Sequence, residues 1–195
     1  MRYLVCVSLI FIFHFSFFNL AHAQGQWNQL QSGDLLFVSD TSGMGQAVKA
    51  STGSYTHVAL VERSGDSLFV IDATPTTGVA RQQYSILNSQ FSIFEVYRLV
   101  VPFDTAAVIA RAKRLIGKPY DNAFLPDNDA YYCSELIQAV FGDLFESKPM
   151  NWRDMEGDLP EYWQKHFAEL GMPVPEGVPG TNPTDLSQSP LLRKL

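Results

Sequence analysis

Cys133 is the first residue that suggests chemistry, because it stands where a segment with helical periodicity begins. The surrounding residues 129–136 read DAYYCSEL, and either Asn128 or Asp129 fits as the N-cap. A sulfur in the first turn of a helix faces unpaired backbone N–H groups and the positive end of the dipole, which favour thiolate over thiol. We therefore expect a nucleophile here. The alternative reading is a small buried apolar side chain.

A cysteine nucleophile usually needs a base, and two histidines are candidates. His57 lies in residues 55–62, a run with strand character, whereas His166 follows Lys165 on an amphipathic segment and is expected to be a solvated or rim residue. His57 is therefore the predicted base.

Hairpin geometry supplies a third polar residue. If Ser64 and Gly65 form a two-residue turn, His57 is directly opposed to Asp72, and a carboxylate there would hold the imidazole in one tautomer and orientation. A turn longer by one residue would instead pair His57 with Ala73 and place Asp72 on the other face. An ordinary strand-edge histidine and aspartate are the simpler alternative.

The N-terminal segment predicts export. Arg2 precedes an apolar stretch, and residues 21–23 read AHA before Gln24, as in a secretory signal peptide cleaved after Ala23. Its polar interruptions make it a poor membrane span. Cleavage would leave Cys133 as the mature chain's one cysteine, which cannot form an internal disulfide. We expect a periplasmic or extracellular protein in which this thiol is buried or used.

Composition narrows the class of protein. The 195 residues are 46% apolar and 17% charged, with a net charge of -6, which argues against disorder and against nucleic-acid binding. The sequence has neither a cofactor motif nor a ligand spacing typical of zinc, so no cofactor or metal is expected. We predict three parts: a signal peptide (1–23), one domain (24–172) and a Pro/Gly-rich tail (173–195) that is irregular and either wraps the surface or is mobile.

Both strands and helices must position Cys133, His57 and Asp72. Strands are predicted at 34–38, 55–62, 67–73, 79–82 and 94–99, and helices at 43–50, from Asp104 to Gly117, at 131–145 and from Pro160 to Gly171. Because strands and helices are segregated along the chain, an α+β fold with an antiparallel sheet is favoured.

Five short segments together resemble a known family. They are residues 33–36 (GDLL), 55–58 (YTHV), 70–73 (VIDA), 117–121 (GKPYD) and 131–136 (YYCSEL). In these the sequence is similar to the YiiX/YebB-like group of papain-like cysteine hydrolases, relatives of NlpC-type peptidases with circularly permuted order. The histidine precedes the cysteine, as in that group.

The resemblance implies a circularly permuted papain-like fold, in which an antiparallel sheet or small barrel packs against helices. It assigns catalysis to Cys133 and His57, with Asp72 at a third position where the group often has glutamate. It also implies that Tyr120 or Tyr132 lies near the site, with Tyr120 the better candidate for substrate contact. Glu135 is expected to be structural, since it faces another side of the helix.

The sequence therefore predicts an exported cysteine hydrolase that cleaves an amide, with a cell-wall peptide as the first candidate substrate and association with the cell envelope. A lipid-directed acyl hydrolase or acyltransferase on the same fold is an alternative, for which Phe91, Phe94 or Phe124 would line an acyl pocket. A non-catalytic binding module is another. The oligomeric state is left open.

Overall fold

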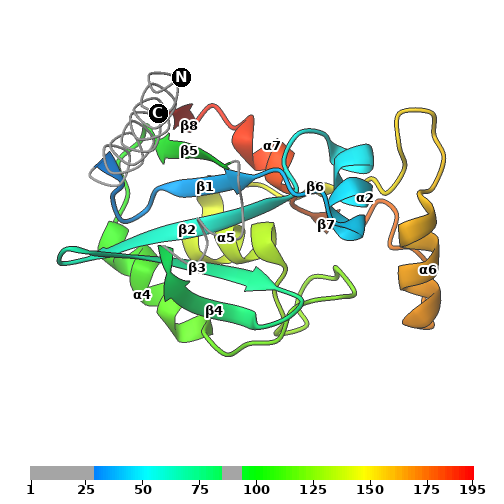
Figure 1. Cartoon of the computed structure of the whole chain (residues 1–195), viewed down its shortest axis with the longest axis horizontal. Helices are drawn as coiled ribbons and strands as arrows, with labels where there is room; N and C mark the ends of the chain where they lie inside the picture. The colour runs from blue at the N-terminus through cyan, green and yellow to red at the C-terminus, as the bar shows by residue number, and fades with distance from the viewer. Residues whose placement is uncertain (1–28, 85–93) are drawn as a thin grey trace, which may run out of the picture. The chain divides into compact units, whose positions relative to one another are not determined.

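A six-stranded antiparallel sheet organises the chain (Figure 1). The structure is a computed structural model that describes residues 29–84 and 94–195. The strand order is β4-β3-β2-β1-β5-β8, so the sheet is open among the described residues. The strands are β1 (Leu35–Val38), β2 (His57–Ser64), β3 (Ser67–Thr74), β4 (Gly78–Gln83), β5 (Phe94–Leu99) and β8 (Leu192–Lys194). A separate short pair joins β6 (Lys148–Pro149) to β7 (Pro179–Gly180).

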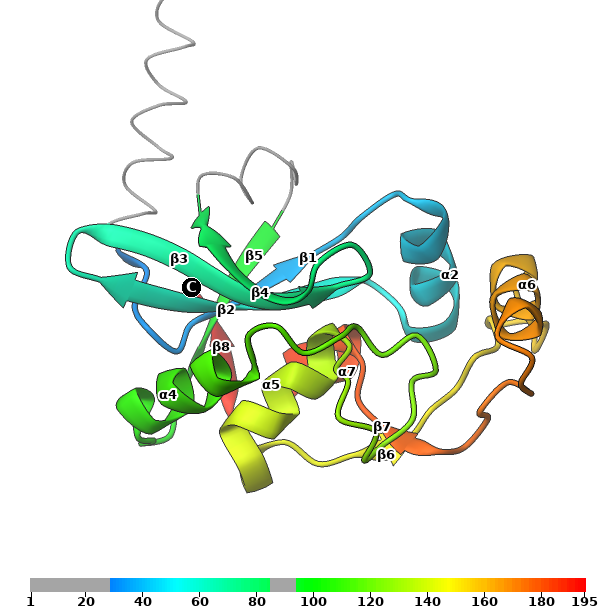
Figure 2. The same cartoon turned by 90° about the horizontal axis from the view of Figure 1, so that it is seen from below.

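Helices cover one face of the sheet and extend beyond one end of it. They are α2 (Gly43–Thr52), α4 (Thr105–Leu115), α5 (Cys133–Phe141), the 3-10 turn η1 (Gly142–Leu144), α6 (Glu161–Glu169) and α7 (Pro183–Ser187). Figure 2 shows α4, α5 and α7 against the sheet, and α2 and α6 beyond the end where β1 finishes and β2 begins. This α+β arrangement is the predicted fold class.

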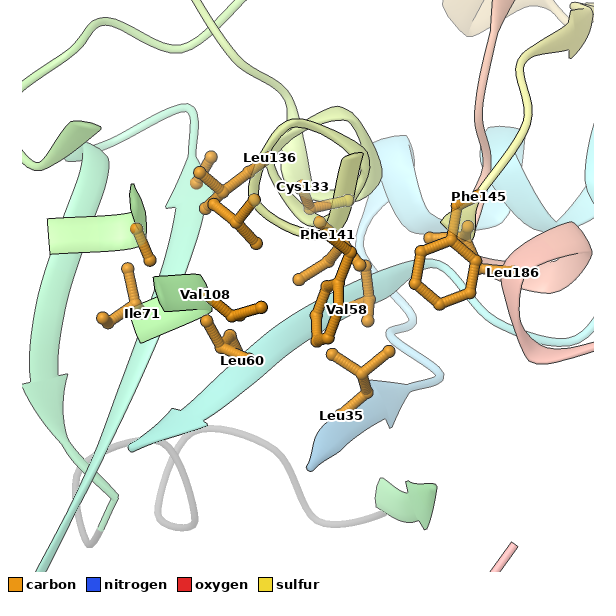
Figure 3. Close-up of a cluster of buried hydrophobic side chains, with 14 of the residues drawn as sticks. Leu35, Val58, Leu60, Ile71, Val108, Cys133, Leu136, Phe141, Phe145 and Leu186 are labelled. Carbon is orange, nitrogen blue, oxygen red and sulfur yellow. The ribbon is translucent and has the colours of Figure 1, made fainter. Parts of the chain in front are cut away.

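The core lies between the sheet and α5. Leu35, Val58, Leu60 and Ile71 project from β1, β2 and β3 toward α5 and α4 (Figure 3), and each is fully buried. Burying an aliphatic side chain of this size contributes about 1.5–3 kcal/mol. The apolar run in each strand therefore fixes α5, and with it Cys133, against the start of β2.

The five strands and the four helices expected from the sequence are found, with two differences in the region of Cys133. The helix begins at Cys133 with Tyr132 as its N-cap, so the prediction that Asn128 or Asp129 caps it is wrong. Asp129 instead adopts φ 57, and the Asn128 side chain accepts a hydrogen bond from the backbone N–H of Ala130, so both residues serve a turn that precedes the helix. The helix ends at Phe141, before Gly142 at φ 64.

The C-terminal segment is more regular than predicted. The prediction of an irregular tail is wrong, because this segment contains β7, α7 and β8. Asn182 caps α7 and Pro183 occupies its first turn, where proline is well tolerated. The residues after Pro190 pair with β5 and extend the sheet.

Candidate active site

His57 and Asp72 meet at the end of the sheet. His57 is the first residue of β2, and its Nε2 lies 3.0 Å from Oδ2 of Asp72 on β3. The Asp72 side chain is fully buried, and its Oδ1 accepts a long hydrogen bond of 3.5 Å from Nε2 of Gln82 on β4. A buried carboxylate held in this way can fix the orientation of the imidazole.

The hairpin reaches this arrangement by a register that differs from the predicted one. The turn residues are Gly65 and Asp66, because Ser64 pairs with Ser67 and Leu60 pairs with Ile71. Continued toward the site, this register places Asp72 diagonally across from His57, so the direct opposition expected from a Ser64–Gly65 turn is wrong. A shift of two residues keeps both side chains on the same face, and a diagonal neighbour remains within reach of a long side chain.

Charged neighbours control the protonation of His57. Burial lowers the pKa of its imidazole, but hydrogen bonds with Asp72 and Cys133, together with the negative charges of these groups, raise it to about 10. Because Nε2 is directed at Asp72, Nδ1 is the ring nitrogen left for the sulfur. The imidazole therefore carries its proton at neutral pH, with Asp72 on one side and Cys133 on the other.

Cys133 occupies the first position of α5 and is 7% exposed. Its backbone N–H is among the first N–H groups of the helix, for which no carbonyl within the helix is available as an acceptor. A carboxyl oxygen of Glu135 accepts a hydrogen bond of 3.3 Å from the backbone N–H of Tyr132, which gives Glu135 the structural role expected from the sequence.

A pocket of about 740 Å³ opens beside Cys133 and His57. Tyr120 and Tyr132 both line it, but they differ in their contacts. Burial, followed by the negative charge of Cys133, raises the pKa of Tyr120 far above its ordinary value, so its phenol stays protonated beside the sulfur. The Tyr132 hydroxyl accepts a hydrogen bond from the backbone N–H of Thr181 and is thereby directed toward the C-terminal segment.

The wall of the pocket with Cys133 and His57 is the first wall. Aromatic and methionine side chains form a second wall, and the sequence did not predict this second wall as a unit. The wall draws on α2, α6 and two connecting segments, and its members include Met44, Phe124, Trp152, Tyr162 and Trp163. Ring centroids of Trp152 lie 4.8 Å from Trp163 and 5.1 Å from Phe124. These residues come from separate segments and follow no shared local pattern, so the sequence indicated only Phe124 among them.

The other residues singled out from the sequence lie in varied places. Phe124 lines the pocket, Phe94 instead packs edge-on against Tyr84, and Phe91 lies outside the described residues. His166 on α6 is half-buried, with its Nε2 2.7 Å from the carbonyl oxygen of Asn122, so it links α6 to the segment that carries Phe124. It does not belong to the pocket lining.

Together, the sheet packed on a cysteine-bearing helix and the histidine that comes earlier in the chain define a permuted papain-like cysteine hydrolase. The sequence model of the C92 family, permuted papain-like amidases named for YaeF and YiiX, matches residues 29–195, and the chain belongs to this family. The protein is accordingly a papain-like cysteine peptidase or amidase.

Two Escherichia coli proteins illustrate the relationship. The protein YiiX of strain K12, described as uncharacterized, is 26% identical over 117 residues, which span 58% of this chain and 58% of that protein. The crystal structure of yiiX from O157:H7, described as a metalloprotein, aligns with a TM-score of 0.72 at 22% identity, covering 86% of this chain and 97% of that chain. The second similarity supports the fold.

Two further findings concern residues 29–84 and 94–195. In this part of the chain no three His, Cys, Asp or Glu side chains form a group that could hold a metal ion. Nor does any helix of this part combine the length and apolar composition that crossing a bilayer requires.

Proposed function

We propose that the protein is an exported amidase in which Cys133 is the nucleophile, His57 the acid and base, and Asp72 the group that orients His57. One observation carries this proposal: the imidazole is hydrogen-bonded to a buried carboxylate on one side and to the cysteine on the other, at the edge of a pocket. This is the relation that activated cysteine nucleophiles require.

The geometry supports a two-step hydrolysis. The Cys133 thiolate attacks the amide carbonyl, and the resulting oxyanion is stabilised by the backbone N–H of Cys133 at the start of α5. The His57 imidazolium donates its proton to the amide nitrogen, the C–N bond breaks, and the amine leaves a thioester on the sulfur. Water then attacks the thioester while His57 accepts a proton from it, which releases the carboxylic acid and restores the thiolate.

A cell-wall peptide is the first candidate substrate. Export, proposed from residues 1–23, would bring the enzyme to the cell envelope, where peptide amides are abundant. Beside the catalytic residues the pocket is lined by Thr74, Thr76, Thr77 and Asn182, whose side chains can form hydrogen bonds with a peptide backbone. The mature protein recovered from the periplasm or the medium is expected to begin with Gln24 on N-terminal sequencing.

A lipid amide or ester is the second candidate, and the second wall of the pocket favours it. Met44, Trp152 and Trp163 provide an apolar surface next to the cysteine. Such a surface would bury an acyl chain at about 0.8 kcal/mol per methylene. On this alternative the same thiolate and imidazole would act on an acyl carbonyl.

Substrate screening with matched variants tests the proposal. The protein would be incubated with peptidoglycan fragments and with acyl amides, and released amines would be quantified. Cys133→Ala should abolish turnover of whichever substrate is cleaved and keep the thermal unfolding temperature. Turnover that persists in Cys133→Ala would disprove the proposed mechanism, and the responsive substrate would decide between peptide and lipid.

A further inference from the structure

Thr181 contacts both residues that flank Cys133. Its backbone N–H donates to the Tyr132 hydroxyl at 3.0 Å, and its carbonyl oxygen accepts from the Ser134 hydroxyl at 3.0 Å. Thr181 and Ser134 are 4% and 1% exposed, so water does not compete for these bonds. The first turn of α5 is therefore held on both sides of the cysteine by one residue of the C-terminal segment.

Thr184, three residues further on, contacts the approach to His57. Its hydroxyl accepts from the backbone N–H of Tyr55 at 3.1 Å and lies 3.3 Å from the carbonyl oxygen of Tyr55, to which it donates. Tyr55 is two residues before His57. One side-chain hydroxyl thus binds both backbone polar groups of the residue that leads into β2.

The link between these two contacts is short and rigid. The Asn182 side chain accepts from the backbone N–H of Asp185 at 2.8 Å, and Pro183 begins α7. Leu186 of the same helix belongs to the core cluster that contains Cys133 and Val58. A proline and a capped helical turn have few accessible conformations, so the spacing between Thr181 and Thr184 is fixed.

We infer that residues 181–184, here called the strap, position the nucleophile relative to the base. This inference rests on the proposed function of Cys133 and His57. Apolar packing holds α5 against β2 without directional preference, whereas the hydrogen bonds of Thr181 and Thr184 fix how the two elements are oriented. Thr181 and Thr184 are thus positioning residues, and Thr181, Asn182 and Pro183 also line the pocket beside the reacting groups.

Thr184→Val tests the strap, because it keeps the side-chain shape and removes the hydroxyl that binds Tyr55. Since misplacement by 1 Å can cost about 100-fold in rate, we expect kcat to fall by roughly 10- to 100-fold with little change in KM. Alkylation of Cys133 by iodoacetamide at neutral pH should slow, and its pH dependence should move toward that of an unassisted thiol, at about 8.5. A purely structural role would not move this pH dependence.

Two further variants serve as controls. Thr184→Ser keeps the hydroxyl and should restore both kcat and the alkylation profile. Ser187→Ala removes a hydroxyl of the same helix whose bond, to the Thr184 carbonyl at 2.7 Å, lies within α7, so it should match the unaltered protein. A Thr184→Val protein with unaltered kcat and alkylation, or a Thr184→Ser protein as impaired as Thr184→Val, would overturn the inference.

The outcomes separate the strap from the catalytic proposal. Should Thr184→Val fail to fold, as judged by circular dichroism, Ser134→Ala removes the bond from α5 to the strap and should slow turnover in the same way. A Ser134→Ala protein with unaltered kinetics would then count against the strap. Activity that survives Cys133→Ala would instead reject the proposed nucleophile itself.

Discussion

The two walls of the pocket are built on opposite principles. One wall holds His57 and Cys133 at the ends of regular elements. His57 is hydrogen-bonded to a buried carboxylate, and Ser134, next to Cys133, is hydrogen-bonded to the strap. The other consists of aromatic rings and methionines from several segments, such as Trp152 and Trp163, packed edge to face.

This difference separates positioning from recognition. Hydrogen bonds and helix ends fix direction, which a reacting pair needs to within a fraction of an ångström. Aromatic and methionine surfaces adapt their shape and add binding energy without fixing direction. Changes in the first wall should therefore reduce kcat, and changes in the second should alter KM and substrate preference.

After Cys133→Ala, the largest loss of kcat is expected from Asp72→Asn. A wrongly oriented histidine loses much of its acid–base contribution, so kcat should fall by about 100- to 10,000-fold. Asp72 raises the pKa of His57, which is about 10, whereas burial lowers it. Activity that requires the imidazolium is lost as the pH rises through this pKa, so the alkaline limb of the pH–rate profile should move to lower pH in the variant.

The matched control for this variant is Asp66→Asn, which removes an equal charge at the exposed tip of the same hairpin. Its kcat and alkaline limb should equal those of the unaltered protein. If Asp72→Asn behaved like Asp66→Asn, the carboxylate behind His57 would have no part in turnover.

A smaller and different effect is expected from Met44→Ala in the second wall. Losing this apolar contact should raise KM for a long-chain acyl amide by about 10-fold, since a few methylenes of contact are worth about 1–3 kcal/mol. With a short peptide both kcat and KM should stay unchanged. Steady-state kinetics on the two substrates provide the measurement.

Met155→Ala is the control for Met44→Ala, because Met155 is 94% exposed and does not line the pocket. It should leave both substrates unaffected. A fall in kcat for the short peptide in Met44→Ala would show that the two walls are not separate in function.

The smallest effect is expected from Glu135→Gln, and it concerns stability. Burial raises the pKa of Glu135 to about 8, opposed by the hydrogen bond from Tyr132 and assisted by the charges of Asp121 and Asp127. A raised carboxyl pKa means that stability present at low pH is lost as the pH rises through about 8. Glutamine stays neutral, so the melting temperature of the variant, relative to that of the unaltered protein, should rise from pH 5 to pH 9. Parallel melting curves over this range would contradict the assignment.

The sequence predicted the elements of the first wall well, because they depend on local signals. Alternating or continuous apolar residues defined the strands, and Asp104 capped α4 as expected, accepting from the backbone N–H of Ala107. The helical periodicity after Cys133 placed the sulfur in the first turn, although the cap itself was misplaced. His57 and Asp72 were brought together in spite of a wrong register, since a two-residue shift preserves the face of a strand.

The second wall and the strap were beyond the reach of the sequence for a physical reason. Trp152 and Phe124 come into contact only after distant segments pack together, and no periodicity in the sequence predicts such a contact. The prolines of the C-terminal segment predicted an irregular chain. Pro183, however, is well placed at the start of a helix, and the residues after Pro190 pair with β5. Tertiary pairing overrode local composition there.

The most direct test of the Cys133–His57 pair is the rate of iodoacetamide alkylation as a function of pH, followed by mass spectrometry on the peptide that contains Cys133. At neutral pH Cys133 beside the His57 imidazolium should react rapidly, whereas in His57→Ala it should react slowly there and accelerate only at alkaline pH, as an unassisted thiol does. Superimposable curves for the two proteins would contradict the pairing on which the account depends.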